Sequence, residues 1–366
     1  MPDVSVSDVT YEDLARLEQE FDDAELQTRM YNQTVRAPLD HLLTGNAAVR
    51  EQHKIYAPLY KKRQEVVAKI PNFWALVLEQ APTEFENYTT PSDSQVFADA
   101  LKSIEVERFE IDDPNGSPRS VVIRFYFDSN EYFEDKVLEK KFWHRRALDG
   151  WSGIVSEPVK INWKKGKDLT QGLTDAAFAL FAARKKQDAA QNGSSNGKAK
   201  ASKITKLPEY KAIIDKIENN TEAALSFFTW FGFISSHGYV SAEESAEANK
   251  KEAEKRAKWA KGEKVEDEDE NDEKDDEDDF FDESEICPNG EEVAEIIVNE
   301  LWPQAIKYFT AAQEADDDDL SELEDADIDD EDDDDEPVDI RSLVPGKGKG
   351  KENGSSASPP PKKRRT

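Results

Sequence analysis

Hydrophobic residues recur at seven-residue spacing through roughly the first sixty positions of the chain. One series comprises Leu14, Phe21, Thr28, Val35, Leu42, Val49 and Tyr56, and a second, offset by three, begins with Leu17, Ala24 and Tyr31. Alternating steps of three and four residues form a seam along one side of a helix. Pro38 and Gly45 interrupt the seam. The pattern therefore predicts either a short helix followed by a long kinked one, or two helices that meet near residues 44–46.

The seam needs an apolar partner. A helix of about 30 residues is ~45 Å long and would project beyond a single small domain. The most economical partner is the same helix of a second copy, which makes residues 1–69 an N-terminal segment with a dimerisation helix. The alternative is that the seam packs on its own domain. The predicted dimerisation residues are Leu14, Leu17, Phe21, Tyr31, Val35, Leu42, Val49 and Tyr56.

A meander of strands follows a short helix that Pro71 is suited to begin. Four stretches of the sequence predict strands. Residues 101–111 alternate between apolar and polar, residues 120–127 form a nearly continuous apolar run, and two further stretches cover 137–148 and 157–164. Short turns between them predict an antiparallel sheet with one face to be covered. Helices expected over about 169–185, 208–224 and 291–311 supply the cover. The predicted fold class is α+β, with residues 70–313 forming one domain.

Charge divides the chain more sharply than hydropathy does. The formal net charge is −32, and two runs account for all of it: 263–285 carries −14 and 314–339 carries −18. Residues 186–206 are rich in Gly, Ser and Lys and predict a basic loop. Residues 314–366 lack the apolar side chains needed to offset the entropy of ordering. We therefore expect an acidic insertion at 263–285 and a disordered acidic tail at 314–366.

Motifs for catalysis and cofactor binding are not found. Cys287 is the single cysteine, and His41, His53, His144 and His237 have no metal-ligand spacing. Neither acidic run has the alternating ligands and glycine turn of a tight Ca²⁺ site. No apolar run approaches the ~18 residues that a membrane span needs, and the N-terminus lacks the features of a signal peptide. The sequence thus predicts neither an enzyme nor a membrane protein, and no cofactor or metal.

A basic cluster follows three prolines near the end of the sequence. Its residues are Lys362, Lys363, Arg364 and Arg365. Such clusters direct nuclear import, although a solvated group of charges is the alternative interpretation. The cluster predicts a nuclear protein, with shuttling through the cytoplasm left open. Ser321, in an acidic context, is a candidate for phosphorylation, which would add negative charge to the tail.

Five motifs occur in an order that resembles the nucleosome-assembly-protein family, in particular its SET-like branch. They are IPNFW (70–74), FYFDSNEYFEDKVLEKKF (125–142), INWKKGKDLT (161–170), SFFTWF (226–231) and LWPQAIKYF (301–309), and an acidic tail follows them. The resemblance implies a homodimer with a long dimerisation helix and an α/β "earmuff" domain in each subunit. It also implies binding of core histones along the underside of the earmuff. The basic loop and the acidic insertion look like departures from the compact SET pattern.

The resemblance also suggests which residues would contact histones. Candidates in the loop after the central strand are Asp128, Glu131, Glu134 and Asp135, which could equally form a solvated loop. Asp168 is a candidate that could instead cap a helix, and Thr229 matches a SET position near the histone-binding surface. In the tail, the candidates are Asp316, Asp317, Asp318, Asp319, Asp332, Asp333, Asp334 and Asp335.

The acidic runs have a clear physical role if the partner is a polycation. A histone would displace their counterions, as a basic protein does on DNA. We therefore predict a histone chaperone that shields histone charge and assists nucleosome assembly and disassembly. The alternative is a regulatory protein that modulates a histone acetyltransferase or inhibits a protein phosphatase, with histone binding secondary. DNA would bind at most weakly, through basic residues such as Lys140, Lys141, Arg145 and Arg146.

Overall fold

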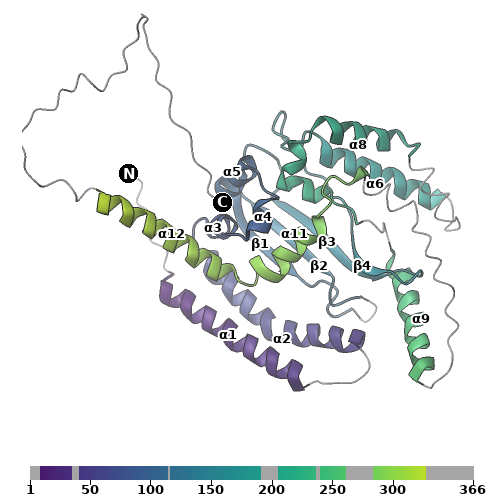
Figure 1. Cartoon of the computed structure of the whole chain (residues 1–366), viewed down its shortest axis with the longest axis horizontal. Coiled ribbons are helices and arrows are strands. Elements are labelled where there is room, and N and C mark those ends of the chain that lie inside the picture. The colour runs from purple at the N-terminus through teal and green to yellow at the C-terminus, as the bar shows by residue number, and fades with distance from the viewer. Residues whose placement is uncertain are drawn as a thin grey trace, which may run out of the picture. The chain divides into compact units, whose positions relative to one another are not determined.

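The computed structural model describes residues 9–34, 41–113, 116–190, 205–235, 240–260 and 283–326. The chain divides into two compact units, Met1–Asp317 and Asp318–Thr366. The first unit holds the helices and strands shown in Figure 1 up to the middle of the last helix. In the second, the structure describes only the helical end of that last helix, up to Ala326.

Two helices form the N-terminal part. α1 spans Tyr11–Thr34 and α2 spans His41–Val67. α2 thus begins before residues 44–46, where the two helices were expected to meet, and residues 35–40 lie outside the described residues. Gly45 lies inside α2, as does Pro58.

The apolar seam of α1 packs against its own chain. Leu14 and Leu17 are buried and join the same core as Val67 and Phe309. The ring of Phe21 lies 6.2 Å from that of Tyr56 and 5.3 Å from that of Tyr60. These predicted dimerisation residues thus have a partner within the subunit, and Leu14 and Leu17 can add little area to a dimer. The expectation that both face a second copy stays a prediction, which their burial within the subunit does not favour.

The other residues of the predicted seam differ in how exposed they are. Tyr31 and Val49 are half-buried. Val35 lies outside the described residues, and so does the side chain of Leu42. Leu26 and Met30, one turn apart on α1, stay exposed. The dimer therefore stays a prediction. Its interface would have to use other surfaces of α1 and α2.

Three short helices lead into the sheet. α3 spans Phe73–Glu79, α4 spans Thr83–Glu86 and α5 spans Pro91–Ala100. α3 begins after Asn72 and not in the turn of Pro71. α5 begins with a capping box, in which the side chains of Thr90 and Asp93 satisfy each other's backbone N–H groups.

The sheet has four strands in the order β1-β2-β3-β4, and every pair is antiparallel. β1 spans Leu101–Glu107, β2 Val121–Phe127, β3 Val137–Arg146 and β4 Ser152–Ser156. The predicted α+β class and antiparallel meander are confirmed. The predicted fourth strand at 157–164 was wrong, because that segment leaves the sheet. Its Trp163 forms an isolated bridge with Phe133, and the Val159 N–H donates to the Phe231 carbonyl at 2.7 Å.

Later helices complete the domain. They are α6 (Leu173–Ala190), α8 (Pro208–Asn219), η1 (Ala223–Leu225), η2 (Phe227–Gly232), α9 (Ala242–Ala260), α11 (Gly290–Ile296), η3 (Ile297–Leu301) and α12 (Ala305–Ala326). The expected single helix over 291–311 is interrupted around Pro303. α12 also continues past residue 314, where we expected the disordered tail to begin. Of the basic loop 186–206, residues 191–204 lie outside the described residues, as do residues 263–282 of the acidic insertion.

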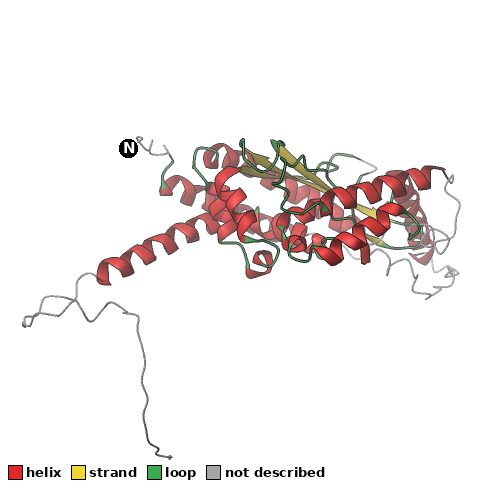
Figure 2. Ribbon diagram, turned by 90° about the horizontal axis from the view of Figure 1, so that it is seen from above, coloured by secondary structure: helices red, strands yellow, loops and turns green. Residues whose placement is uncertain are grey.

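An aromatic cluster from η2 covers one face of the sheet. The ring of Phe125 lies 5.5 Å from that of Phe227 and 6.0 Å from that of Trp230. The buried carboxylate of Asp93 accepts hydrogen bonds from the Ser226 hydroxyl at 2.7 Å and the Phe227 N–H at 2.9 Å, which fixes η2 to α5. Seen from above, the strands run along one side of the body and most helices lie on the other (Figure 2). The opposite face of β1–β3 is left to carry polar side chains.

Candidate functional site

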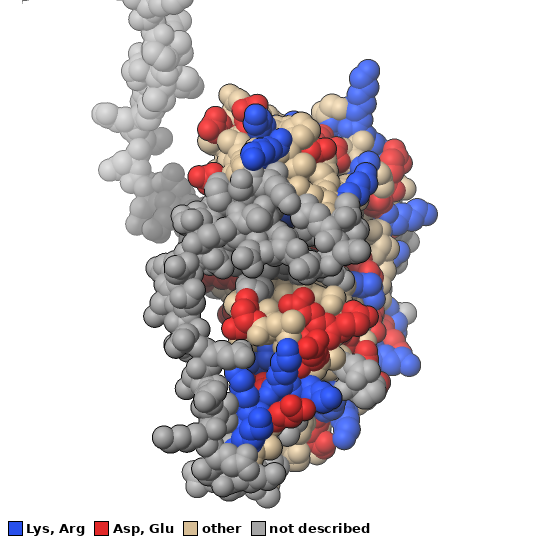
Figure 3. All heavy atoms as spheres, turned by 90° about the vertical axis from the view of Figure 1, so that its right-hand side faces the viewer, with Lys and Arg blue, Asp and Glu red and all other residues tan. Residues whose placement is uncertain are grey.

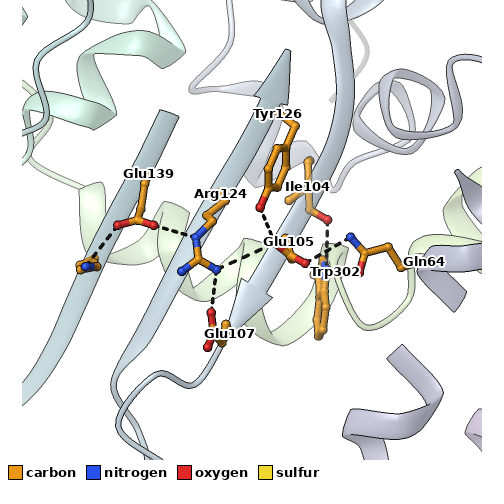
Figure 4. Close-up of polar contacts among 9 residues, drawn as sticks. Gln64, Ile104, Glu105, Glu107, Arg124, Tyr126, Glu139 and Trp302 are labelled. Atoms are coloured by element: carbon orange, nitrogen blue, oxygen red, sulfur yellow. Dashed lines mark hydrogen bonds and ion pairs between the residues drawn. The ribbon is translucent and has the colours of Figure 1, made fainter. Parts of the chain in front are cut away.

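The open face of the sheet carries a network of charges centred on Arg124. Its Nε donates to Glu139 at 2.7 Å and its Nη1 donates to Glu107 at 2.7 Å. A carboxylate oxygen of Glu105 lies 3.8 Å from the same Nη1. The strand register places Glu105, Arg124 and Glu139 directly across from one another, with Glu107 beside them (Figure 4).

Neighbours other than Arg124 also hold these carboxylates. Glu105 accepts the Tyr126 hydroxyl at 2.6 Å and the Gln64 amide at 3.2 Å (Figure 4). Glu139 pairs with Lys141 at 3.2 Å. Partial burial raises the pKa of Tyr126 to about 12, and its bond to Glu105 adds to the effect. For Glu139, partial burial opposes the shift, but hydrogen bonds from Arg124 and Lys141 leave its pKa lowered.

A cavity of about 600 Å³ lies between α2 and this face of the sheet. Its lining includes Tyr56, Tyr60, Glu105, Arg108 and Trp302. On its floor, Arg63 is buried and lies 4.7–5.7 Å from four aromatic ring centroids, those of Phe21, Tyr60, Trp74 and Trp302. The Arg63 Nη1 donates to the carbonyls of Trp302 and Pro303, and burial lowers the pKa of Arg63 to about 10. Arg63 therefore fastens α2 to the C-terminal helices.

The acidic loop after β2 is largely paired with lysines. Asp128 lies 3.7 Å from Lys102, Glu131 lies 2.6 Å from Lys167 and Glu134 lies 3.7 Å from Lys164. Asp135 accepts two hydrogen bonds from Asn162, both at 2.7 Å. The structure brings these four candidates into one loop, but as a mixed-charge surface and not as an acidic patch.

Asp168 organises a tight loop before α6. Its carboxylate accepts the backbone N–H of Thr170 at 2.8 Å, the Thr170 hydroxyl at 2.7 Å and the N–H of Gly172 at 2.6 Å. Gln171 and Gly172 both have positive φ, at 49° and 82°, a conformation that needs local support. The bonds favour the capping interpretation of Asp168 over client contact.

We expect Asp168→Ala to lower the free energy of unfolding by about 1–2 kcal/mol, since three backbone and hydroxyl donors lose their acceptor. Urea denaturation followed by circular dichroism measures the change. Asp128→Ala is the matched control and should change stability by less than about 0.5 kcal/mol, because Asp128 is an exposed member of a surface pair. A similar cost for both variants would contradict the assignment of Asp168 as a loop anchor.

Thr229 is buried, with its hydroxyl 2.7 Å from the carbonyl of Ser226. It lies in η2 inside the aromatic cluster, which does not favour its predicted contact with a client. The same Ser226 carbonyl accepts the Thr229 N–H at 3.0 Å, so the hydroxyl adds a second bond to this 3-10 turn.

The basic residues considered for DNA do not form one patch. Lys140 and Arg145 are buried, and Arg145 makes a two-pronged pair with Glu110 at 2.7 and 2.8 Å. An exposed basic group lies on α9 instead, made of Lys250, Lys251, Lys255 and Lys258. Figure 3 shows Lys and Arg gathered low on this side of the molecule, at the height of α9, below a group of acidic side chains.

The acidic insertion ends inside the fold. Glu285 is half-buried and accepts the N–H groups of Ile234 at 3.0 Å and Cys287 at 2.9 Å. Burial raises the pKa of Glu285 to about 7, against these bonds and the nearby charge of Lys140. Burial also raises the pKa of Cys287 to about 12. This thiol is therefore protonated at neutral pH.

Several predicted residues cannot be placed. For Asp316, Asp317, Asp318 and Asp319 the structure describes the helical backbone alone. Asp332, Asp333, Asp334, Asp335 and the basic cluster 362–365 lie outside the described residues.

Within the described ranges, no three His, Cys, Asp or Glu side chains are grouped to hold a metal ion, and no helix has the length and apolarity to cross a membrane.

The open-face network was missed by sequence reasoning. A signal existed, since Glu105 and Glu107 alternate with Ile104 and Val106, and Glu139 alternates with Leu138 and Lys140. This alternation places the glutamates on the face opposite the core. That they meet around Arg124 depends on strand register, which the alternation does not supply.

Comparison with known proteins places most of the chain in one family. A family model described as nucleosome assembly protein (NAP) matches residues 9–312. Protein SET of Drosophila melanogaster is 37% identical over 34% of this chain and 44% of its own length. NAP1-related protein 2 of Arabidopsis thaliana is 29% identical over 72% of this chain and 66% of its own length. A Schizosaccharomyces pombe protein named for nucleosome assembly is 34% identical over 43% of this chain and 59% of its own length.

These matches span about half to two thirds of the relatives' lengths. Among solved structures, that of Vps75 is 19% identical, with a TM-score of 0.44 over 80% of this chain and 99% of that chain. The structure of Ccp1 is 24% identical, with a TM-score of 0.38 over 83% of this chain and 95% of that chain.

Proposed function

This chain belongs to the nucleosome assembly protein family, and from that premise we propose that it is a histone chaperone. It would bind core histones, shield their charge and assist nucleosome assembly and disassembly. The observation that carries the proposal is the family match over residues 9–312, which includes every element from α1 to the packed part of α12. The net charge of −32, concentrated in two runs, supports a polycationic client.

The proposed mechanism divides the work between two parts of the chain. The acidic runs at 263–285 and 314–339 attract histone tails by counterion release, which gives fast but unselective capture. The open face of the sheet, with Glu105, Glu107 and Glu139, would contact the folded histones. The carboxylate of Glu105 is held by Tyr126 and Gln64 and that of Glu139 by Lys141, so these two groups lose little freedom when a client binds.

Further parts of the proposal extend to assembly and partners. The chain would act as a homodimer in the nucleus, with import directed by residues 362–365. A histone acetyltransferase is a proposed additional partner, and DNA would bind at most weakly. The alternative function is a regulator that modulates an acetyltransferase or inhibits a phosphatase, for which histone binding would be secondary.

Titration of both core histone pairs onto the full chain and onto residues 1–317 at two salt concentrations tests the proposal. Residues 1–317 form one compact unit, and circular dichroism checks that it remains folded. A chaperone is expected to keep histone affinity in the short form, with a weaker dependence on salt because fewer counterions are released. Absence of histone binding by the full chain near physiological salt would overturn the proposal.

A further inference from the structure

Arg124 occupies the centre of the surface that we propose for histones. Its side chain is 22% exposed, and its donors point at Glu107 and Glu139, with Glu105 close by (Figure 4). The three carboxylates come from two strands on either side of β2. A cation of this chain therefore already fills the position that a cationic client would seek.

Two of the three carboxylates, those of Glu105 and Glu139, have partners other than Arg124. Glu105 is held by Tyr126 and Gln64, and Glu139 is held by Lys141. All three glutamates extend from strands whose backbones are fixed in the sheet. Removal of Arg124 should leave these groups near their present positions and open to solvent.

The geometry favours a guanidinium over an ammonium. Arg124 uses Nε and Nη1 to reach two different glutamates, both at 2.7 Å. A planar guanidinium can donate in two fixed directions at once, whereas an ammonium is a compact point charge. The same arrangement would suit an arginine side chain from another protein.

We propose that Arg124 is a specificity-determining residue that competes with client arginines for Glu105, Glu107 and Glu139. Its presence lowers the affinity of the open face, which keeps the capture of histones reversible. This inference rests on the proposed histone binding. A purely structural cross-strand pair is the competing explanation, and it predicts no change in selectivity between arginine and lysine.

The experiment compares the wild-type full chain with Arg124→Gln and Lys141→Gln. Both substitutions remove one positive charge from the same face, but only the first vacates the position between the three glutamates. We expect Arg124→Gln to bind core histones about 5-fold more tightly, and Lys141→Gln to change binding by less than about 2-fold. Equal gains for both variants would overturn the proposal, because net charge alone would then explain them.

Two matched peptides, octa-arginine and octa-lysine, separate this inference from the proposed function. The acidic runs are common to all three proteins, so their contribution cancels when the variants are compared. We expect the ratio of arginine-peptide to lysine-peptide affinity to rise in Arg124→Gln alone. If the wild type ignores histones but the ratio rises, the proposed function fails and the guanidinium selectivity stands. An unchanged ratio overturns the inference whatever the histones do.

Thermal unfolding of each variant checks folding. If Arg124→Gln does not fold, Arg124→Lys provides the second test, since it keeps the charge without the planar fork. Arg124→Lys should raise the ratio of arginine-peptide to lysine-peptide affinity by less than Arg124→Gln does. An unchanged ratio in Arg124→Lys would count against the proposal.

Discussion

Lys140→Met is expected to lower the free energy of unfolding by about 3–5 kcal/mol, because it removes one partner from a buried charged network. Lys140 is fully buried in β3, and its ammonium donates to the carbonyls of Glu157 at 2.9 Å, Phe231 at 3.2 Å and Phe233 at 2.6 Å. A methionine of similar length would remove the Lys140 donor from the carbonyls of Glu157 and Phe233, whereas the Phe231 carbonyl keeps its bond from the Val159 N–H. Glu285 would also lose its nearby positive charge.

The deficit of Lys140→Met should depend on pH. Burial raises the pKa of Glu285 from 4.5 to about 7. The contribution of Glu285 to the free energy of unfolding is therefore fully present below pH 4.5 and is lost as the pH rises through 7. Lys140 opposes that rise, and its removal should raise the pKa of Glu285 further. Burial also lowers the pKa of Lys140 to about 7, so the wild type bears the cost of a buried ammonium at low pH. The deficit should therefore be larger at pH 8 than at pH 5.

Urea denaturation at the two pH values measures this difference. Lys141→Met is the control, since Lys141 is the next residue on the same strand but its side chain is 42% exposed. Its effect should stay within about 0.5 kcal/mol. If both lysines proved equally dispensable, the carbonyl cluster would not be a stabilising centre.

Local patterns of apolar residues were sufficient to predict three of the four strands, with alternation indicating β1 and a nearly continuous apolar run indicating β2. In β2, the residues Val121, Ile123, Phe125 and Phe127 face the core. A short apolar run of this kind is best interpreted as a central strand. The error at 157–164 arose because Val159, Ile161 and Trp163 also alternate, but they face η2 and the loop around Phe133. The pairing partner of a segment is a property of the tertiary fold. β4 itself is short and contains Gly153, so it resembled a turn.

The same reasoning could have excluded one candidate. Lys140 shares its side of β3 with Leu138 and Phe142, which predicts burial from alternation alone. Arg145 could not be excluded in this way. It lies on the other side of the strand, and its burial comes from Glu110, which a loop carries onto β3. Thr229 was predicted by resemblance, and in the structure its hydroxyl bonds to the Ser226 carbonyl within its own 3-10 turn.

Neutralisation of the open face should have the largest effect on client binding. The triple variant Glu105→Gln, Glu107→Gln and Glu139→Gln is expected to weaken histone binding by about 10-fold or more, since each exposed ion pair contributes up to ~1 kcal/mol. The substitutions keep side-chain size and leave the core face untouched. The wild-type cluster of three glutamates, Arg124 and Lys141 has one net negative charge, and the variant has two net positive charges. The face would then repel a histone.

The control must carry the same change in total charge. Glu243→Gln, Glu244→Gln and Glu247→Gln on α9 meet this condition, because these glutamates are polar residues outside the open-face network. Isothermal titration of both triple variants with each core histone pair measures the difference. If the acidic runs alone held the client, both variants would lose the same small amount of affinity, because long-range attraction depends on total charge. A loss confined to the β1–β3 variant requires direct contact there, because salt screens exposed charges beyond roughly 8 Å.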